Sequence, residues 1–204
     1  MITLLIATSN PGKVREYEKL LVGLPVAITY PAQEKLALEV DECGDTFEEN
    51  ARIKALAFAR ASCLLTLADD SGLEVDALGR APGVRSARYA GPHATDADRN
   101  RKLLAELKDV PAAERSARFG CVVALARPDG RMHTDEGTLE GMIGFAPRGE
   151  HGFGYDPLFI VDGYDGLTLA ELGPELKNRI SHRAQAVAAA RPSLERILGG
   201  EARS

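Results

Sequence analysis

Two adjacent carboxylates, Asp69 and Asp70, directly follow an apolar run and are the clearest candidates for chemistry in this chain. The run covers residues 64–68 (LLTLA) and predicts a short buried strand. Ligands of open α/β sheets bind outside the carboxyl ends of strands, and two buried acids need a cationic partner. A hard metal ion with phosphate oxygens is such a partner. An ordinary Asp-Asp-Ser-Gly turn is the alternative, so other segments must decide between them.

A second acidic pair, Asp41 and Glu42, lies shortly before a predicted helix. This helix begins near Asp45, a candidate N-cap with a glutamate three residues later, and it carries Lys54 on its apolar face. Such a lysine either extends its ammonium group to solvent or orients and neutralises nearby carboxylates. Carboxylates from these segments together with Asp70 suit Mg²⁺, which proteins hold by one or two carboxylates, substrate phosphates and waters.

A first candidate anion site covers residues 8–13 (TSNPGK), between a predicted strand and a predicted helix. The segment offers hydroxyls, an amide, backbone N–H groups and the amine of Lys13, which is the chemistry of a phosphate cradle. The Walker A pattern GxxxxGK[ST] is absent. A turn with a helix cap fits the same residues.

A second candidate anion site is the segment 181–183 (SHR). Ser181 is a plausible N-cap, which places His182 and Arg183 in a first helical turn, where positive side chains oppose the helix dipole. A bound anion resolves this mismatch, because arginine forks onto phosphate or a base carbonyl. Lys177, expected in a loop, adds another cation. The alternative is a frayed helix start.

Residues 152–157 (GFGYDP) have the composition of a base-binding platform. Aromatic faces stack on purines, and glycine lets the backbone come close to a ligand. An aromatic turn that packs against the core is the competing interpretation.

Composition limits the function classes. The 204 residues fit one large domain or two small lobes, and the net charge of −5 argues against a dedicated nucleic-acid binder. The three cysteines, none at CxxC spacing, predict reduced and mostly buried thiols in a cytosolic protein. We expect no signal peptide, and the apolar runs are too short for a membrane span.

Periodicity predicts alternating strands and helices. We expect strands at 2–7, 64–68, 73–78 and 158–161, and a hairpin of 116–127 and 131–140 around Pro-Asp-Gly. We expect helices from 14 to 21, from near 45, from 95 to 108 and from 181 to 198. The prediction is an α/β fold over residues 1–204, a single domain whose mixed central sheet is flanked by helices, with two lobes around a nucleotide-binding cleft.

Taken together, these motifs resemble those of the inosine triphosphate pyrophosphatases, also called XTP/dITP pyrophosphatases. The matching segments span nearly the whole chain in the order of that family. They are ATSNPGK at 7–13, GDTFEENA at 44–51 with Lys54, ADDSGL at 68–73, PGVRSARY at 82–89, GFGYDP at 152–157, and Lys177 with SHR at 181–183.

The resemblance implies Mg²⁺-dependent hydrolysis of deaminated purine nucleoside triphosphates (ITP, dITP, XTP) to the monophosphate and pyrophosphate, by a cytoplasmic homodimer. It makes Asp70 the general base or metal-linked acid, supported by Lys54 and Asp69, and Asp41 the other metal-side acid. The substrate-binding residues that it implies are Thr8, Ser9, Asn10, Pro11, Gly12, Lys13, Ser71, Phe153, Gly154, Tyr155, Asp156, Lys177, His182 and Arg183.

Two positions depart from the family pattern. The metal-side acid is usually glutamate, so Glu42 competes with Asp41 for that role, and Ser9 stands where glycine is common. Two other functions stay open at this point. One is a pyrophosphatase for modified pyrimidine or 7-methylguanine nucleotides, and the other is a nucleotide-binding module without catalysis.

Overall fold

The structure is a computed structural model that describes residues 2–201. Its helices and strands are β1 (Ile2–Ile6), α1 (Pro11–Leu20), β2 (Val26–Thr29), α2 (Phe47–Ser62), β3 (Leu65–Val75), α3 (Asp96–Glu106), β4 (Ser116–Ala126), β5 (Met132–Ile143), β6 (Phe159–Val161), α4 (Gly173–Ile180) and α5 (His182–Glu201). Three short 3₁₀-helices cover Asp76–Leu78, Gly83–Arg88 and Ala112–Glu114.

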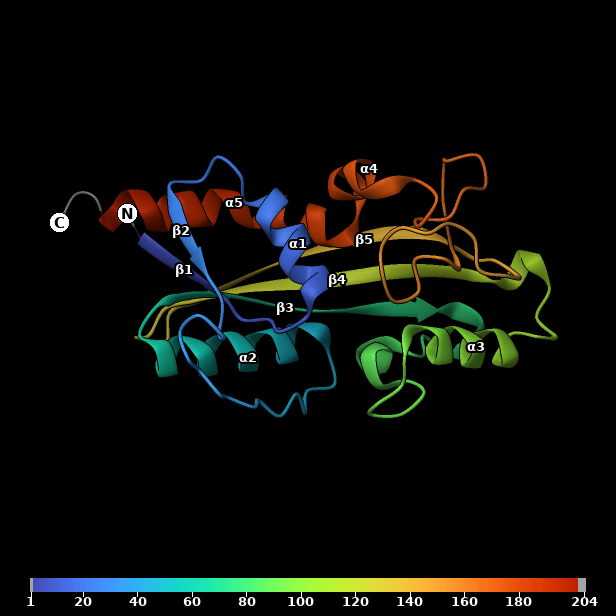
Figure 1. Cartoon of the computed structure of the whole chain (residues 1–204), viewed down its shortest axis with the longest axis horizontal. Coiled ribbons are helices and arrows are strands. Elements are labelled where there is room, and N and C mark those ends of the chain that lie inside the picture. The colour runs from blue at the N-terminus through green and yellow to red at the C-terminus, as the bar shows by residue number, and fades with distance from the viewer. Residues whose placement is uncertain (1, 202–204) are drawn as a thin grey trace. The chain divides into compact units, whose positions relative to one another are not determined.

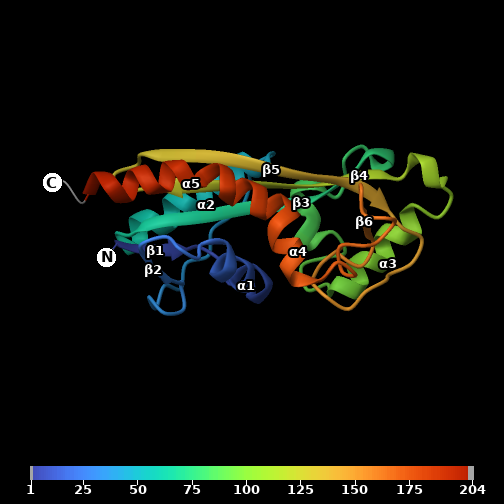
Figure 2. The same ribbon diagram turned by 90° about the horizontal axis from the view of Figure 1, so that it is seen from above.

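The strands form one mixed sheet in the order β2-β1-β3-β4-β5-β6. β1 pairs parallel with β2 and β3, so that Leu5 lies opposite both Thr29 and Thr66. β5 pairs antiparallel with β6, with Met142 opposite Ile160. The long strands β4 and β5 run alongside each other (Figures 1 and 2). The α/β fold with a mixed sheet and flanking helices is confirmed.

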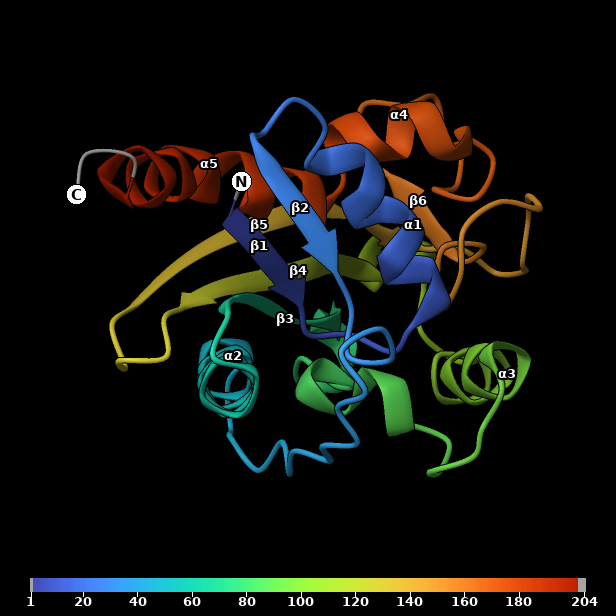
Figure 3. The same cartoon turned by 60° about the vertical axis from the view of Figure 1, so that its left-hand side comes forward.

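The chain divides into two compact units. The first takes the residues up to Asp70, Cys121–Gly137, and the residues from Arg183 on. Side chains alternate between the two faces of its strands, as the pleat requires. Leu4 and Ile6 pack with residues of α1 and α5, whereas Leu5 packs with residues of α2. The sheet of this unit is therefore covered by α1 and α5 on one face and by α2 on the other (Figures 1 and 3).

The second unit comprises Ser71–Gly120 and Thr138–His182. Its core joins residues of β3, β4 and β5 to Leu103 and Leu107 of α3. Within this unit, α3 and α4 lie on opposite sides of the strands (Figures 1 and 3). Arg115, only 2% exposed, donates to the carbonyls of Leu107, Val110 and Gly144, so its buried guanidinium ties the end of α3 to the end of β5.

Several predicted elements are confirmed with small shifts. The hairpin and the helix opened by Thr95 lie where the sequence predicts them, and Thr95 forms a capping box with Asp98. The cap of α2 is Thr46 rather than Asp45, because Thr46 accepts from the Glu49 N–H while the Glu49 carboxylate accepts from the Thr46 N–H. β2 and α4 were not predicted. Two of the three cysteines are exposed, contrary to expectation, and all three are free thiols.

The main correction concerns β3. Asp69 and Asp70 do not follow a strand but lie in the middle of an 11-residue one, which runs on to Val75. The alternative of an Asp-Asp-Ser-Gly turn at residues 69–72 is wrong, and the strand expected at 73–78 is the continuation of β3, which ends at Val75. Lys13 and Arg183 compensate the charge of Asp69, and Asn50 donates a hydrogen bond to Asp70, so the strand continues. Over residues 2–201, none of the helices combines the length and apolar character needed to cross a bilayer.

Candidate active site

The carboxylate of Asp69 is buried in the first unit at the centre of a cluster of cations. Its side chain is 2% exposed. Oδ2 lies 2.9 Å from Lys13 Nζ, at the start of α1, and accepts from Nη2 and Nε of Arg183, on α5, at 3.0 and 3.2 Å. Although burial alone favours the neutral acid, Lys13 and Arg183 hold the pKa of Asp69 well below its usual range. Asp69 is therefore a fixed anion rather than a proton carrier.

Arg183 lies deeper than the sequence suggested. It is 1% exposed, and besides Asp69 it pairs with the buried carboxylate of Glu16 on α1. The positive charge in the first turn of α5 is thus compensated by two carboxylates of the protein itself. Asp69 and Glu16 take the place of the bound anion that the helix dipole suggested. In this structure the guanidinium of Arg183 supports Asp69, and its role as a substrate ligand stays a prediction.

Asp70 faces α2 and has a different environment. It is 7% exposed, and Oδ2 accepts from Nδ2 of Asn50 at 3.1 Å. Asn50 also accepts from the Gly44 N–H at 2.8 Å, so one amide holds both Asp70 and the loop before α2. A Cβ at Gly44 would lie 2.6 Å from Glu49 Cβ, which explains why this close approach needs glycine. Burial, and to a lesser degree Glu42, raises the pKa of Asp70.

Lys54 points inward, as expected if it neutralises nearby carboxylates rather than extending to solvent. Its side chain is 15% exposed, Nζ donates to the Asp69 carbonyl at 3.0 Å, and it forms an ion pair with Glu42. Burial opposes its charge, but Asp69 and Glu42 raise the pKa of Lys54, so the amine stays protonated. Of the two acids in the preceding loop, Glu42 is the one brought to Lys54, whereas Asp41 is exposed.

The segment 8–13 has the expected strand–loop–helix form, but its N–H groups are already used. Asn10 is the N-cap of α1, and its Oδ1 accepts from the N–H groups of Gly12 and Lys13 at 2.8 and 3.3 Å. In this structure the N–H groups of Gly12 and Lys13 therefore serve a side-chain cap, and the phosphate-binding role of the segment stays a prediction. What the segment still offers is Lys13 Nζ, the hydroxyls of Thr8 and Ser9, and the exposed surface of Asn10 and Pro11.

The carboxylates of Glu42 and Asp70 suit a divalent cation whose coordination shell is completed by a bound ligand. Within residues 2–201, no group of three or more His, Cys, Asp and Glu side chains could hold a metal ion alone. The negative charge of Glu42 helps to raise the pKa of Asp70, an effect that a bound cation would reverse. Because Mg²⁺ commonly takes one or two carboxylates and completes its shell with phosphates and waters, this pair suits it.

The second unit holds the predicted aromatic turn in one defined conformation. Asp156, 3% exposed, accepts from the Phe153 N–H at 2.9 Å and from Lys177 Nζ at 2.5 Å. Lys177 lies on α4 rather than in a loop, and Nζ is 4.4 Å from the centroid of the Phe153 ring. A Cβ at Gly152 would lie 2.0 Å from Asp156 Oδ2, so glycine is required there. Asp156 thus organises the turn from inside.

The remaining predicted residues of the second unit come from separate segments of the chain. The ring of His182 stacks on Phe119, with centroids 4.8 Å apart and an angle of 17° between planes. Tyr155 is buried, and its hydroxyl donates to the Ser86 carbonyl at 3.0 Å. Ser71 follows Asp70 on β3 and is half-buried. Phe119 was not predicted.

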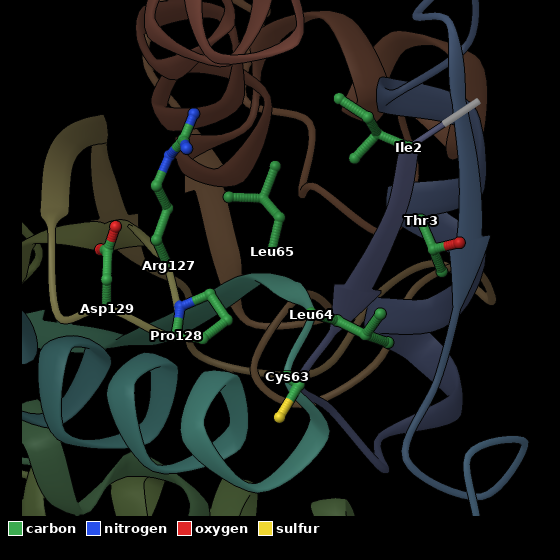
Figure 4. A pocket seen from close by; sticks show the side chains of 8 residues that line it. All are labelled: Ile2, Thr3, Cys63, Leu64, Leu65, Arg127, Pro128 and Asp129. Atoms are coloured by element: carbon green, nitrogen blue, oxygen red, sulfur yellow. The ribbon is translucent and has the colours of Figure 1, made fainter. Parts of the chain in front are cut away.

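A pocket of about 360 Å³ lies in the first unit, at the N-terminal ends of β1 and β3 (Figure 4). Its lining is mixed, with the apolar Leu64, Leu65 and Pro128 beside the charged Arg127 and Asp129. None of the predicted site residues, all of which the structure describes, lines it. Ligands of parallel strands bind at the opposite, carboxyl ends, so we do not assign the site to this pocket.

Sequence reasoning missed Asn50 and Glu16, which hold Asp70 and Arg183 respectively. Asn50 stands four residues before Lys54 on α2, and this spacing puts both on one face of the helix, a signal that was available. Glu16 stands three residues after Lys13 and carries the same signal.

Comparison with known proteins gives a consistent result. The model of the Ham1 family matches residues 4–193. A protein of Geobacter sulfurreducens called dITP/XTP pyrophosphatase is 50% identical over 188 residues, 92% of this chain and 94% of its own length. One of Geobacillus kaustophilus with the same name is 48% identical over all 204 residues and covers 100% of both chains. The structure of a HAM1 protein from Coxiella burnetii matches with a TM-score of 0.87 and 42% identity, over 96% of this chain and 99% of that one.

Proposed function

Because this chain belongs to the Ham1 family, we propose that it hydrolyses deaminated purine nucleoside triphosphates, namely ITP, dITP and XTP, to the nucleoside monophosphate and pyrophosphate. Such an activity removes these nucleotides before they enter DNA or RNA. The observation that carries the proposal is the pair Asp69 and Asp70. They are neighbours on one strand, but Asp69 stays charged and pairs with cations, whereas Asp70 has a raised pKa.

In the proposed reaction, Asp70 takes a proton from a water molecule whose oxygen attacks the α-phosphorus. The bond from that phosphorus to the oxygen bridging to the β-phosphate breaks, and the electron pair leaves with pyrophosphate. Lys13 and Lys54 place positive charge beside Asp70, where it stabilises the charge that develops on phosphate oxygens. Catalysis of phosphoryl transfer is mostly positioning and charge stabilisation, which this rigid cluster suits.

Mg²⁺ is the proposed cofactor, held by Asp70 and Glu42, with Glu42 in place of the predicted Asp41. When bound, it polarises phosphoryl oxygens and lowers the pKa of water. The inward position of Glu42 and its electrostatic coupling to Asp70 support this choice over Asp41, which is exposed.

The turn at residues 152–156 is proposed to bind the base. The Phe153 ring offers a stacking face, and Lys177, whose Nζ lies over that ring, offers a donor beside it. His182, stacked on Phe119 in the same unit, is proposed as a further donor. Hypoxanthine and xanthine carry an oxo acceptor at C6, whereas adenine carries an amino donor. A site built around a donor at this position can reject adenine by about 10⁴-fold or more.

The family resemblance also supports a homodimer located in the cytoplasm. Exposed free thiols at Cys43 and Cys63 accord with a reducing compartment. Sedimentation of the purified chain at several concentrations tests the dimer.

Product analysis tests the proposed reaction. ITP is incubated with the protein, once with Mg²⁺ and once with EDTA, and pyrophosphate and orthophosphate are measured separately. The proposal requires metal-dependent release of one pyrophosphate per IMP. Release of orthophosphate instead would refute it, and nucleotide binding without turnover would favour a binding module.

A further inference from the structure

The helix α3 holds the aromatic turn by the backbone of a single residue, Gly154. The Gly154 N–H donates to Oδ2 of Asp96 at 2.7 Å, and its carbonyl accepts from Nδ2 of Asn100 at 3.0 Å. Asp96 and Asn100 are four residues apart on α3, so they project from one face of the helix. Both backbone polar groups of Gly154 are therefore fixed by side chains 54 to 58 residues away in the sequence.

The conformation that is held in this way is unusual. Gly154 has φ +65°, in the left-handed region, although a Cβ at this position would meet no atom within 4 Å. Space does not select the conformation, and glycine readily adopts others. The two hydrogen bonds from α3 are what select this one within the second unit.

The conformation of Gly154 sets the direction of the residue before it. Phe153 is tied on its own N–H to Asp156, and its ring lies over Lys177 Nζ. With its N–H held from inside the turn and the next residue held from α3, the backbone on both sides of Phe153 is fixed, which limits the directions that its ring can take.

We infer that Asp96 and Asn100 are positioning residues for base recognition: they act through Gly154 to hold the Phe153 ring in the orientation that stacks on the base. This inference rests on the proposed function for the identity of the ligand. The clamp itself is a property of the turn, and it can be tested without substrate. A displacement of about 1 Å in a positioning group can cost about 100-fold in rate, so loss of the clamp has a measurable consequence.

Asp96 also contacts Arg99, and the experiment must separate this contact from the one with Gly154. It forms an ion pair with Arg99, and Arg99 also donates to the carbonyls of Ala87 and Ala94 at 3.0 and 2.7 Å. Asp96→Asn keeps an oxygen that can accept from Gly154 but removes the charge that pairs with Arg99. Asp96→Ala removes both. Comparison of the two variants isolates the contact with Gly154.

The substrate-free test uses a fluorescent reporter. The chain contains no tryptophan, so Phe153→Trp places a single tryptophan in the turn. Anisotropy and acrylamide quenching are measured in this background for Asn100→Leu, Asp96→Ala and Asp96→Asn. Arg101→Ala serves as the control on α3, because Arg101 is exposed and its ion pair with Asp98 lies at the surface. Circular dichroism verifies that α3 persists in each variant.

We expect lower anisotropy and at least twofold stronger quenching for Asn100→Leu and Asp96→Ala, and values near the parent for Asp96→Asn and Arg101→Ala. Equal anisotropy and quenching in all variants would overturn the inference, whatever the protein hydrolyses. If the buried Asn100→Leu fails to fold, the half-exposed Asp96 supplies the decisive pair of variants.

The second arm uses the natural Phe153 and kinetics. We expect KM for ITP to rise about tenfold in Asp96→Ala and Asn100→Leu while kcat changes less than threefold, with Asp96→Asn restoring KM. Inhibition by inorganic triphosphate, which lacks a base, should stay unchanged. An unchanged KM for ITP, or a parallel loss of triphosphate inhibition, would contradict the role in base recognition. Absence of turnover in the unmodified protein would refute the proposed function, and the fluorescence result would still decide the clamp.

Discussion

Although Asp69 and Asp70 are neighbours on β3, replacing each by asparagine should affect stability differently. Asp69→Asn should lower the melting temperature, whereas Asp70→Asn should not. Asp69→Asn removes the charge that Lys13 and Arg183 share. Loss of one partner from a buried ion pair costs about 3–5 kcal/mol. Glu16 remains as a partner for Arg183, so the loss should lie near the lower end. At about 2–4 °C per kcal/mol for a chain of this size, Tm should fall by roughly 6–12 °C.

Asp70→Asn should leave stability unchanged or slightly higher. Burial raises the pKa of Asp70, which means that its charge is unfavourable in the fold, and Asn50 can still donate to the oxygen that remains. Turnover should nevertheless fall by about 10²–10⁴-fold, the usual contribution of a general base. The assay is thermal unfolding of both variants in EDTA, with pyrophosphate release from ITP in Mg²⁺.

The pH dependence of the free energy of unfolding shows whether the charge of Asp69 stabilises the fold. Its folded pKa is depressed, so its contribution to the free energy of unfolding is complete above the unfolded carboxyl pKa and declines as pH falls. The difference in stability between the parent and Asp69→Asn should therefore be constant near neutral pH and shrink below about pH 4. Equal melting temperatures for the two proteins at neutral pH, or a gap that widens in acid, would refute the reasoning.

Three further predictions concern the acids and the aromatic turn. Glu42→Gln should reduce turnover of ITP by about 100-fold and raise the Mg²⁺ concentration needed for half-maximal rate. Asp41→Asn should change each of these two quantities by less than threefold. Equal effects of the two variants in a Mg²⁺ titration would reject the choice of Glu42. Lys177→Met should leave the buried Asp156 carboxylate unpaired and lower stability by about 3 kcal/mol in urea unfolding, and an unchanged midpoint would show that the pair contributes nothing. Gly152→Ala should displace Asp156 and raise KM for ITP, because the new Cβ would lie 2.0 Å from its carboxylate; an unchanged KM would show that the turn adapts.

The parts of the fold set by local sequence were predictable. Apolar periodicity located β1, the hairpin of β4 and β5, and the starts of α1 and α3, because each depends on neighbouring side chains and caps. Lys54 was singled out as a possible partner of the acids, and Lys13 as part of a candidate anion site between a strand and a helix. Lys54 does contact Asp69, as does Lys13.

The parts set by distant partners were not predictable. Arg183 and Asp69 are 114 residues apart, and the sequence shows an unmatched charge in each place without showing that they match each other. For the same reason, the strand was predicted to end at Ala68, because two buried acids need cationic partners that the local sequence does not show. The choice between Asp41 and Glu42 depends on how the loop before α2 turns, which Asn50 fixes through Gly44.

The most direct test of the account is the selectivity of pyrophosphate release among ITP, XTP, GTP and ATP in Mg²⁺, measured as kcat/KM, with Asp70→Asn run in parallel. The account predicts that ITP and XTP exceed GTP and ATP by orders of magnitude, and that Asp70→Asn lowers turnover of ITP and XTP by about 10²–10⁴-fold. Comparable turnover of GTP and ATP, or full activity of Asp70→Asn, would contradict it.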